Sequence, residues 1–398
     1  MFRYIFVLLA FCLVSTPCFS ADNEPSLIDL FGEETAQNQA ETPKVEQPAA
    51  QPTDSATVAA EKPEKVDDAG IFSFLNFSFL RKKEKAQEFV RKENEPQENY
   101  LDRMTRLAEE DGDVEAALTL GYMYLYGENG VEADDAKAFK YYELAAAKDD
   151  IVALNNLGSL YFSGVGTNRD IEKAAALFKR AAELGNSEAA VNLAFIYLTA
   201  RGGTDATTRS EVVRLFSQAA EGGNTTAQYM LGMIYYNGFG VTKNDDKAFI
   251  YLKKAASTFD EAQYQLGLRY MNAEGTPRNY GNAVKYLAHA ANQGHVPSMI
   301  WLGDILSAGV NYPKNEVDAY VWYNVASVYD AASAAEKRDA LEKRLKIEVL
   351  LQAQAKAEGF KIRPTEMTKY IHSTFGTELS KYVTKSVAEK PKPEAKNQ

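Results

Sequence analysis

Two kinds of residue in this sequence could do chemistry: a glycine pair and a few histidines. Gly238-x-Gly240 has the spacing of a loop that holds phosphate groups with its backbone amides. However, no strand is expected before these glycines and no Lys-Ser or Lys-Thr follows them, so the phosphate interpretation fails. His289 and His295 are too far apart for the i, i+3 or i+4 pair of a zinc helix, and His372 is the third histidine. We therefore predict no metal and no cofactor.

Motifs for nucleophilic catalysis are also missing. The sequence contains no Gly-x-Ser-x-Gly, Ser-x-x-Lys or Lys-Thr-Gly motif. Its two cysteines, Cys12 and Cys18, both lie near the N-terminus. We expect that segment to be removed, which would leave no cysteine nucleophile and no disulfide. The sequence therefore predicts no catalytic residue and a protein that is not an enzyme.

The glycine pair belongs to a repeat. A small residue that follows Leu recurs every 35 to 38 residues. Its positions are Gly121, Gly158, Ala194, Gly232, Gly267 and Gly303. A period this constant indicates an array of similar units and has to be recognised before any local motif is interpreted.

Each unit has the signals of two helices joined by a loop. A column of good N-cap residues precedes the second helix, helix B: Asp134, Asp170, Thr208, Asn244, Asn279 and Asn315. Side chains of these types accept hydrogen bonds from the first free amides of a helix. Gly238 and Gly240 are then expected to end the first helix, helix A, through a left-handed backbone conformation.

The combined pattern is Leu-Gly-x-x-Tyr, Gly-x-Gly, an Asp or Asn cap, Lys-Ala and Ala-Ala. It resembles the Sel-one-like repeat (SLR) family, a relative of the tetratricopeptide repeat (TPR), in its exported bacterial type. The pattern is clearest at Leu157-Gly158, Tyr161, Gly164, Gly166, Asp170, Lys173-Ala174 and Ala181-Ala182. The third unit lacks Gly-x-Gly and the Lys-Ala step, and the sixth keeps only Gly309. The resemblance implies an all-α fold, a right-handed α-solenoid of about six antiparallel helix pairs that acts as an interaction scaffold.

Composition divides the chain into segments. In chain order we expect a signal peptide at 1–20, a disordered Pro/Ala/Glu-rich linker at 21–70, an aromatic and basic segment at 71–85, N-terminal capping helices at 86–111, six repeats at 112–331, C-terminal capping helices at 332–385 and a disordered tail at 386–398. The apolar run of the signal peptide is too short to span a bilayer.

Charge and hydropathy limit the partners. The net charge is −11, which argues against nucleic acid or an anionic lipid surface as the main partner. No apolar stretch after the signal peptide reaches eighteen residues, so we expect no membrane span after cleavage. The chain is predicted to be exported to the periplasm, with secretion and surface display as open alternatives.

The segment 71–85 combines four phenylalanines with a basic run. Three hypotheses fit it: it covers the open end of the solenoid, it docks on a partner, or it anchors weakly to a membrane. Its candidate docking residues are Phe72, Phe74, Phe77 and Phe79.

One face of helix A is expected to line a concave groove, as in the tetratricopeptide relatives. In the fourth and fifth units this face is rich in aromatic residues and methionine, types that are favoured at protein interfaces. The candidate groove residues are Phe195, Tyr229, Met233, Tyr236, Tyr264 and Met271. The competing interpretation is that such a stripe only packs neighbouring repeats together.

The function predicted from these features is an exported, non-enzymatic scaffold that binds a protein in the groove. An inner-membrane sensor and a component of an envelope machine are candidate partners. The alternative is a glycan-binding or cell-wall-modifying envelope protein. Glycan sites need aromatic platforms flanked by carboxylates, and the sequence shows no obvious carboxylate pair beside Tyr236 or Tyr264. The row Asn155, Asn192, Asn237 and Asn272 instead favours a protein partner.

Overall fold

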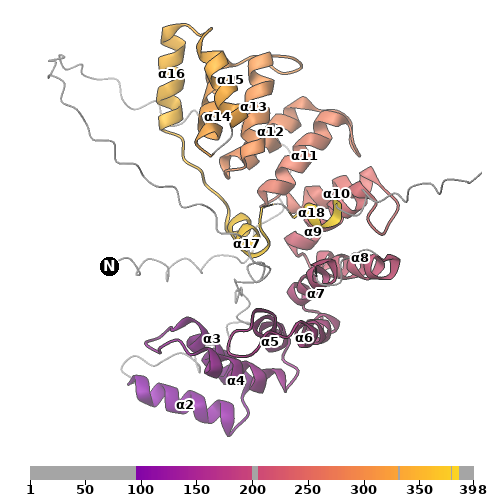
Figure 1. The fold of residues 1–398 in the computed structure, drawn as a ribbon, viewed down its shortest axis with the longest axis vertical. Helices are drawn as coiled ribbons and strands as arrows, with labels where there is room; N and C mark the ends of the chain where they lie inside the picture. Colours follow the sequence, from indigo (N-terminus) through magenta and orange to yellow (C-terminus); the bar gives the residue numbers. More distant parts are fainter. Residues whose placement is uncertain (1–95, 200–204, 330–331, 378, 385–398) are drawn as a thin grey trace, which may run out of the picture. The chain divides into compact units, whose positions relative to one another are not determined.

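The computed structural model describes residues 96–199, 205–329, 332–377 and 379–384 (Figure 1). Within these ranges the regular secondary structure is α-helical throughout, as the sequence predicts. The expected signal peptide, linker, aromatic segment 71–85 with its four phenylalanines, and tail 386–398 lie outside the described residues.

Six helix pairs form the repeats. The A helices are α3 (Val114–Tyr126), α5 (Ile151–Ser163), α7 (Ser187–Thr199), α9 (Thr225–Asn237), α11 (Asp260–Asn272) and α13 (Val296–Ala308). The B helices are α4 (Asp135–Ala146), α6 (Ile171–Glu183), α8 (Ala206–Glu221), α10 (Asp245–Ala255), α12 (Tyr280–Asn292) and α14 (Glu316–Val328).

The helices pack in chain order. Each A helix contacts the B helix of its own unit, and each B helix contacts the A helix of the next unit, from α3 to α14. α2 (Gln97–Glu109) packs on α3, while α15 (Ala332–Glu342) and α16 (Ile347–Glu358) pack on α14. The result is a stack of helix pairs of the solenoid type, so the predicted fold class is confirmed.

The small residue in helix A allows its pair to approach closely. A Cβ atom at Gly158 would lie 2.9 Å from the Phe178 ring, and one at Gly303 would lie 2.4 Å from the Tyr323 ring. Contacts this short require atoms to shift, so a larger residue would push helix A away from helix B. The Leu-Gly step therefore sets the close spacing of the pairs that contain it, and Ala194 takes its place in the third unit.

The caps of helix B follow the predicted column at every unit except one. Asp134, Asp170 and their counterparts accept the expected amide hydrogen bonds. In the third unit the cap is Asp205, and the predicted Thr208 lies inside the helix, where its amide donates to the Asp205 carboxylate at 2.9 Å. The prediction of Thr208 was wrong because Asp205, a stronger capping residue, starts α8 three residues earlier.

The glycines of the loop tie adjacent units together. Gly275 has φ +69°, a left-handed conformation, and an added Cβ would lie 2.1 Å from the carbonyl oxygen of Asp245 at the start of α10. Gly166 has φ +68° and stands in the same relation to Asp135 at the start of α4. The glycine at this loop position, which at Gly166 is the second of Gly-x-Gly, thus packs against the preceding B helix.

The last two helices do not extend the stack. α17 (Glu366–Phe375) and α18 (Lys381–Thr384) turn back along the repeats, and α18 contacts α9 (Figure 1). The segment 332–385 was expected to cap the C-terminal end. α15 and α16 lie at that end, whereas α17 and α18 lie against the middle units because their apolar faces find partners there.

Replacing Gly275 with alanine should lower the free energy of unfolding by about 3 kcal/mol, because the methyl group meets backbone atoms and the backbone is left-handed. Gly223→Ala is the matched control: its φ is +84°, but nothing lies within 4 Å of the added Cβ. We expect it to cost about 1 kcal/mol. Urea unfolding followed by circular dichroism measures both, and equal losses would contradict the packing role.

Candidate functional site

The six candidate groove residues lie on α7, α9 and α11. Phe195 and Tyr229 are fully buried and Met233 is 4% exposed. Tyr236, Tyr264 and Met271 are partly exposed. We call the surface that these three helices present to α17 and α18 the A-helix face. α17 and α18, which we call the C-terminal segment, cover the part of this face formed by α7, α9 and the start of α11.

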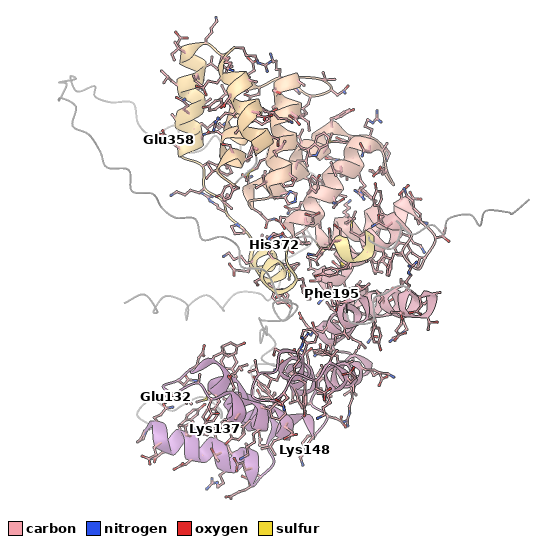
Figure 2. All side chains as sticks on the ribbon, viewed as in Figure 1. Glu132, Lys137, Lys148, Phe195, Glu358 and His372 are labelled. Carbon is pink, nitrogen blue, oxygen red and sulfur yellow. The ribbon has the colours of Figure 1, made fainter. Side chains whose placement is uncertain are left out.

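Phe195 lies at the centre of an aromatic cluster. Its ring stacks on Phe375 of α17, with 4.5 Å between centroids, and meets Tyr382 of α18 edge-on at 5.5 Å. On its other side it packs edge-on against Phe216 of α8. The labels of Phe195 and His372 mark this region in Figure 2. Phe195 thus belongs partly to the repeat core and partly to the contact with the C-terminal segment.

Tyr229 is covered in a similar way. Its ring packs edge-on against Phe259, which in turn meets the ring of His372 on α17. His372 Nε2 also lies 3.0 Å from the carboxylate of Asp260. An aromatic and a polar contact therefore hold α17 against the start of α11.

Glu261 organises the polar part of the A-helix face. Its carboxylate receives a hydrogen bond from the Tyr229 hydroxyl at 3.3 Å and lies 2.9 Å from His295 Nε2. Gln265 donates to the same carboxylate, and Tyr264 packs against the His295 ring. Burial alone would raise the pKa of Glu261, but the hydrogen bonds and the nearby His295 outweigh it and lower that pKa.

Glu261 is not among the residues predicted from the sequence, although it stands three residues before Tyr264. The premise that no obvious carboxylate pair lies near Tyr264 therefore has to be corrected, since Asp260 and Glu261 begin the same helix. Each of them faces a histidine, His372 and His295 respectively. The sequence contained a local signal for this, because Glu261 and Tyr264 are three residues apart and so lie one helical turn from each other.

Tyr236 serves as a platform for a buried cation. The guanidinium carbon of Arg269 lies 3.9 Å from the centre of the Tyr236 ring. Arg269 is 2% exposed, and it donates to the side chain of Gln265 at 2.8 Å. Burial lowers the pKa of Arg269. The arrangement fixes Tyr236 and connects it with the polar residues around Glu261.

The start of α17 is fixed by hydroxyl groups. The Thr365 hydroxyl donates to the carbonyl of Thr258. The Thr368 hydroxyl donates to the side-chain oxygen of Gln293 at 2.7 Å. The Thr368 oxygen also accepts from the backbone amide of Asp260 at 3.2 Å. These contacts join the start of α17 to the turn between α10 and α11, to the first residue of α11 and to the C-terminal end of α12.

That last hydrogen bond replaces a missing cap. Phe259 occupies the N-cap position of α11 and makes no side-chain cap. At the same place the other repeats have residues that accept an amide hydrogen bond: Asp113, Asp150, Asn186, Asn224 and His295. In the fifth unit the amide of Asp260 donates to Thr368, 108 residues further along the chain, while the Asp260 carboxylate accepts from the amide of Glu261.

A second hydrogen bond joins α17 to the third unit. The Tyr370 hydroxyl donates to the Glu188 carboxylate of α7 at 2.7 Å. Burial raises the pKa of Glu188 despite this hydrogen bond. Burial and the nearby carboxylate raise the pKa of Tyr370 well above its ordinary value. α17 thus bridges α7 and α11.

Other predicted features have simpler roles. Of the amide row, Asn192 donates to Asn155 at 3.0 Å, so this pair joins two adjacent repeats. Among the described residues no group of three or more His, Cys, Asp or Glu could hold a metal ion. The described helices also include none that is long and apolar enough to cross a bilayer.

Comparison with known families agrees with this architecture. The Sel1 repeat family matches residues 114–150, 151–186, 225–257, 260–295 and 296–327. The chain is a Sel1 repeat protein. The third helix pair, α7 and α8, is not among the matched segments, in line with its missing glycines and its displaced cap. It packs in the stack like the others.

This Sel1 repeat protein is similar to several known proteins. A protective antigen of uropathogenic Escherichia coli with an SLR fold is 25% identical, with 75% of this chain and 69% of that chain covered and a TM-score of 0.44. A Sel1 repeat protein from Oxalobacter formigenes is 29% identical, with 57% and 92% covered and a TM-score of 0.48.

A curated relative, chitin synthase regulatory factor 3 of Schizosaccharomyces pombe, is 34% identical over 84 residues. Those residues are 21% of this chain and only 9% of the length of that relative. The shared part corresponds to the length of little more than two repeats.

Glu188→Gln should stabilise the chain at pH 7 relative to wild type, and this difference should shrink as the pH falls to 4. In the folded chain the pKa of Glu188 lies above its ordinary value of 4.5, so folding favours the protonated carboxyl group. The wild-type free energy of unfolding therefore falls as the pH rises through this raised pKa. Glutamine keeps an acceptor for Tyr370 and does not titrate.

Urea unfolding at the two pH values measures this difference. Glu172→Gln, at an exposed position of α6, is the control for the loss of one charge. A difference between Glu188→Gln and wild type that stays the same at pH 4 and pH 7 would contradict the assignment.

Proposed function

We propose that this Sel1 repeat protein is an exported, non-enzymatic scaffold that binds a helical segment of a protein partner on its A-helix face. Sel1 repeat proteins are generally protein-interaction scaffolds. The observation that carries the proposal is the occupied state of this face: an amphipathic helix, α17, is seated on α7 and α11 through aromatic contacts and hydrogen bonds. A surface that holds a helix in this way has the chemistry to hold another.

The composition of the face supports a protein ligand. Phe195, Tyr229 and Phe259 supply aromatic surface, while Glu188 and Asp260 supply polar partners at its two ends. Interfaces that bind tightly combine buried aromatic anchors with a few placed polar groups. The N-terminal sequence 1–20 supports export, and an envelope protein or membrane sensor remains the partner class that we favour.

A photo-crosslinking amino acid placed at Tyr264 should capture a protein partner in cells. Tyr264 is partly exposed on the A-helix face, so the probe can reach a bound segment. The matched control carries the same amino acid at Ile250, which is 52% exposed on the B helix α10. Mass spectrometry of the crosslinked products should identify a helical segment of the partner from the Tyr264 probe and not from the Ile250 probe.

Two results would contradict the proposal. Capture of the same protein from both positions would place binding elsewhere. Capture of a glycan in place of a protein at Tyr264 would favour the alternative envelope function.

A further inference from the structure

The C-terminal segment resembles a bound ligand more than a structural part of the repeat array. It is joined to α16 by residues 359–365 and lies against α7, α9 and α11, which precede it by more than ninety residues. Its two helices have 10 and 4 residues. Isolated helices this short are marginal in water, so they depend on the surface that they cover.

The buried face of α17 has a definite pattern. Thr368, Ile371 and Phe375 are 1%, 0% and 2% exposed, and they follow the i, i+3, i+7 spacing of one helix face. The opposite face carries Lys369 and Ser373, which are exposed. The segment therefore contains an amphipathic helix whose buried face presents a hydroxyl, an aliphatic and an aromatic residue, in that order.

The A-helix face carries a matching group for two of these residues. Phe375 stacks on Phe195, and Thr368 completes the cap that Phe259 leaves open in α11. Within the array the Asp260 carboxylate accepts from the amide of Glu261, and the amide of Asp260 finds its acceptor in a hydroxyl from outside the array. This feature is specific to the fifth unit and points to recognition of a helix that presents such a hydroxyl.

We propose that α17 and α18 are an internal ligand of the A-helix face, and that the partner displaces them with an amphipathic helix carrying the same hydroxyl, aliphatic and aromatic residues at i, i+3 and i+7. This inference rests on the proposed function and names the kind of segment that the face takes. Because the segment is tethered, it competes at an effective concentration in the millimolar range. The wild-type chain is therefore largely closed until a stronger ligand arrives.

A labelled synthetic peptide with the sequence of residues 361–384 is the probe. Fluorescence anisotropy measures its binding to the full chain and to the full-length Phe375→Asp variant, whose own segment is weakened. We expect the peptide to bind the variant at least about tenfold more tightly than wild type, because the internal competitor is removed. A peptide with Asp at both Ile371 and Phe375 should not bind either chain.

Leu351→Asp is the matched control variant. Leu351 is 58% exposed on α16, so this change adds the same charge to a C-terminal helix without touching the A-helix face. The control should bind the peptide as weakly as wild type. Circular dichroism checks that each variant is folded.

A second variant keeps the test decisive if Phe375→Asp does not fold. Thr368→Val combined with Tyr370→Phe removes the hydroxyl contacts with Gln293, Asp260 and Glu188 and keeps the apolar face. It should also bind the peptide more tightly than wild type.

Three outcomes overturn the inference. Equal affinity of wild type and the folded variants would show that the segment does not compete. Failure of the peptide to bind any of them would show that the face does not recognise it. A wild-type chain that is a dimer by light scattering, and becomes a monomer in Phe375→Asp, would show that the segment is exchanged between copies. None of these results depends on the natural partner, so each is separable from failure of the crosslinking experiment.

Discussion

The close approach of helix A to helix B is the constraint on which the rest of the structure depends. At Gly158, Gly232 and Gly303 the facing side chain of helix B leaves less than 3 Å for a Cβ atom. This contact fixes those pairs, and the left-handed loop glycines Gly166, Gly240 and Gly275 pack against the preceding B helix. Because the helix pairs stack in the same order throughout, with Ala194 in place of the glycine in the third unit, residues at equivalent positions of the A helices fall on equivalent surfaces. An extended surface made of equivalent A-helix positions follows from this repetition.

The specific part of the molecule arises where the repetition fails. The third unit lacks its glycine pair and moves its cap to Asp205, and the fifth has Phe259 where the other units have a capping side chain. α17 contacts both units, through Glu188 and through the amide of Asp260. Departures from the repeat pattern therefore coincide with the surface that holds the C-terminal segment. The repeats supply the stack of helix pairs, and the exceptions are the places where that stack holds α17.

Most of the fold could be predicted from sequence because its signals are local. The glycine column, the cap column and the period each reflect contacts within about forty residues, and the structure has the helix pairs that they indicate. The position of α17 could not be predicted, because its hydrogen bonds join residues 108 and 182 positions apart. A hint was present in Phe259, the one residue in the column of described A-helix caps whose side chain cannot accept a hydrogen bond. The candidate residues were placed on the expected helices, but the sequence could not show that Phe195 and Tyr229 are covered by the chain itself, nor that Glu261 joins Tyr229 to His295.

The most direct test of this account is a distance measurement between spin labels on α17 and on a B helix. Cysteines at Ser373 and Lys179, both exposed, would carry the labels in a full chain whose Cys12 and Cys18 are replaced by serine. If α17 is held on the A-helix face of its own chain, double electron–electron resonance at high dilution gives one narrow distribution of the distance between the two labels. A broad distribution in the unliganded protein would show that the segment is not held there and would contradict the account.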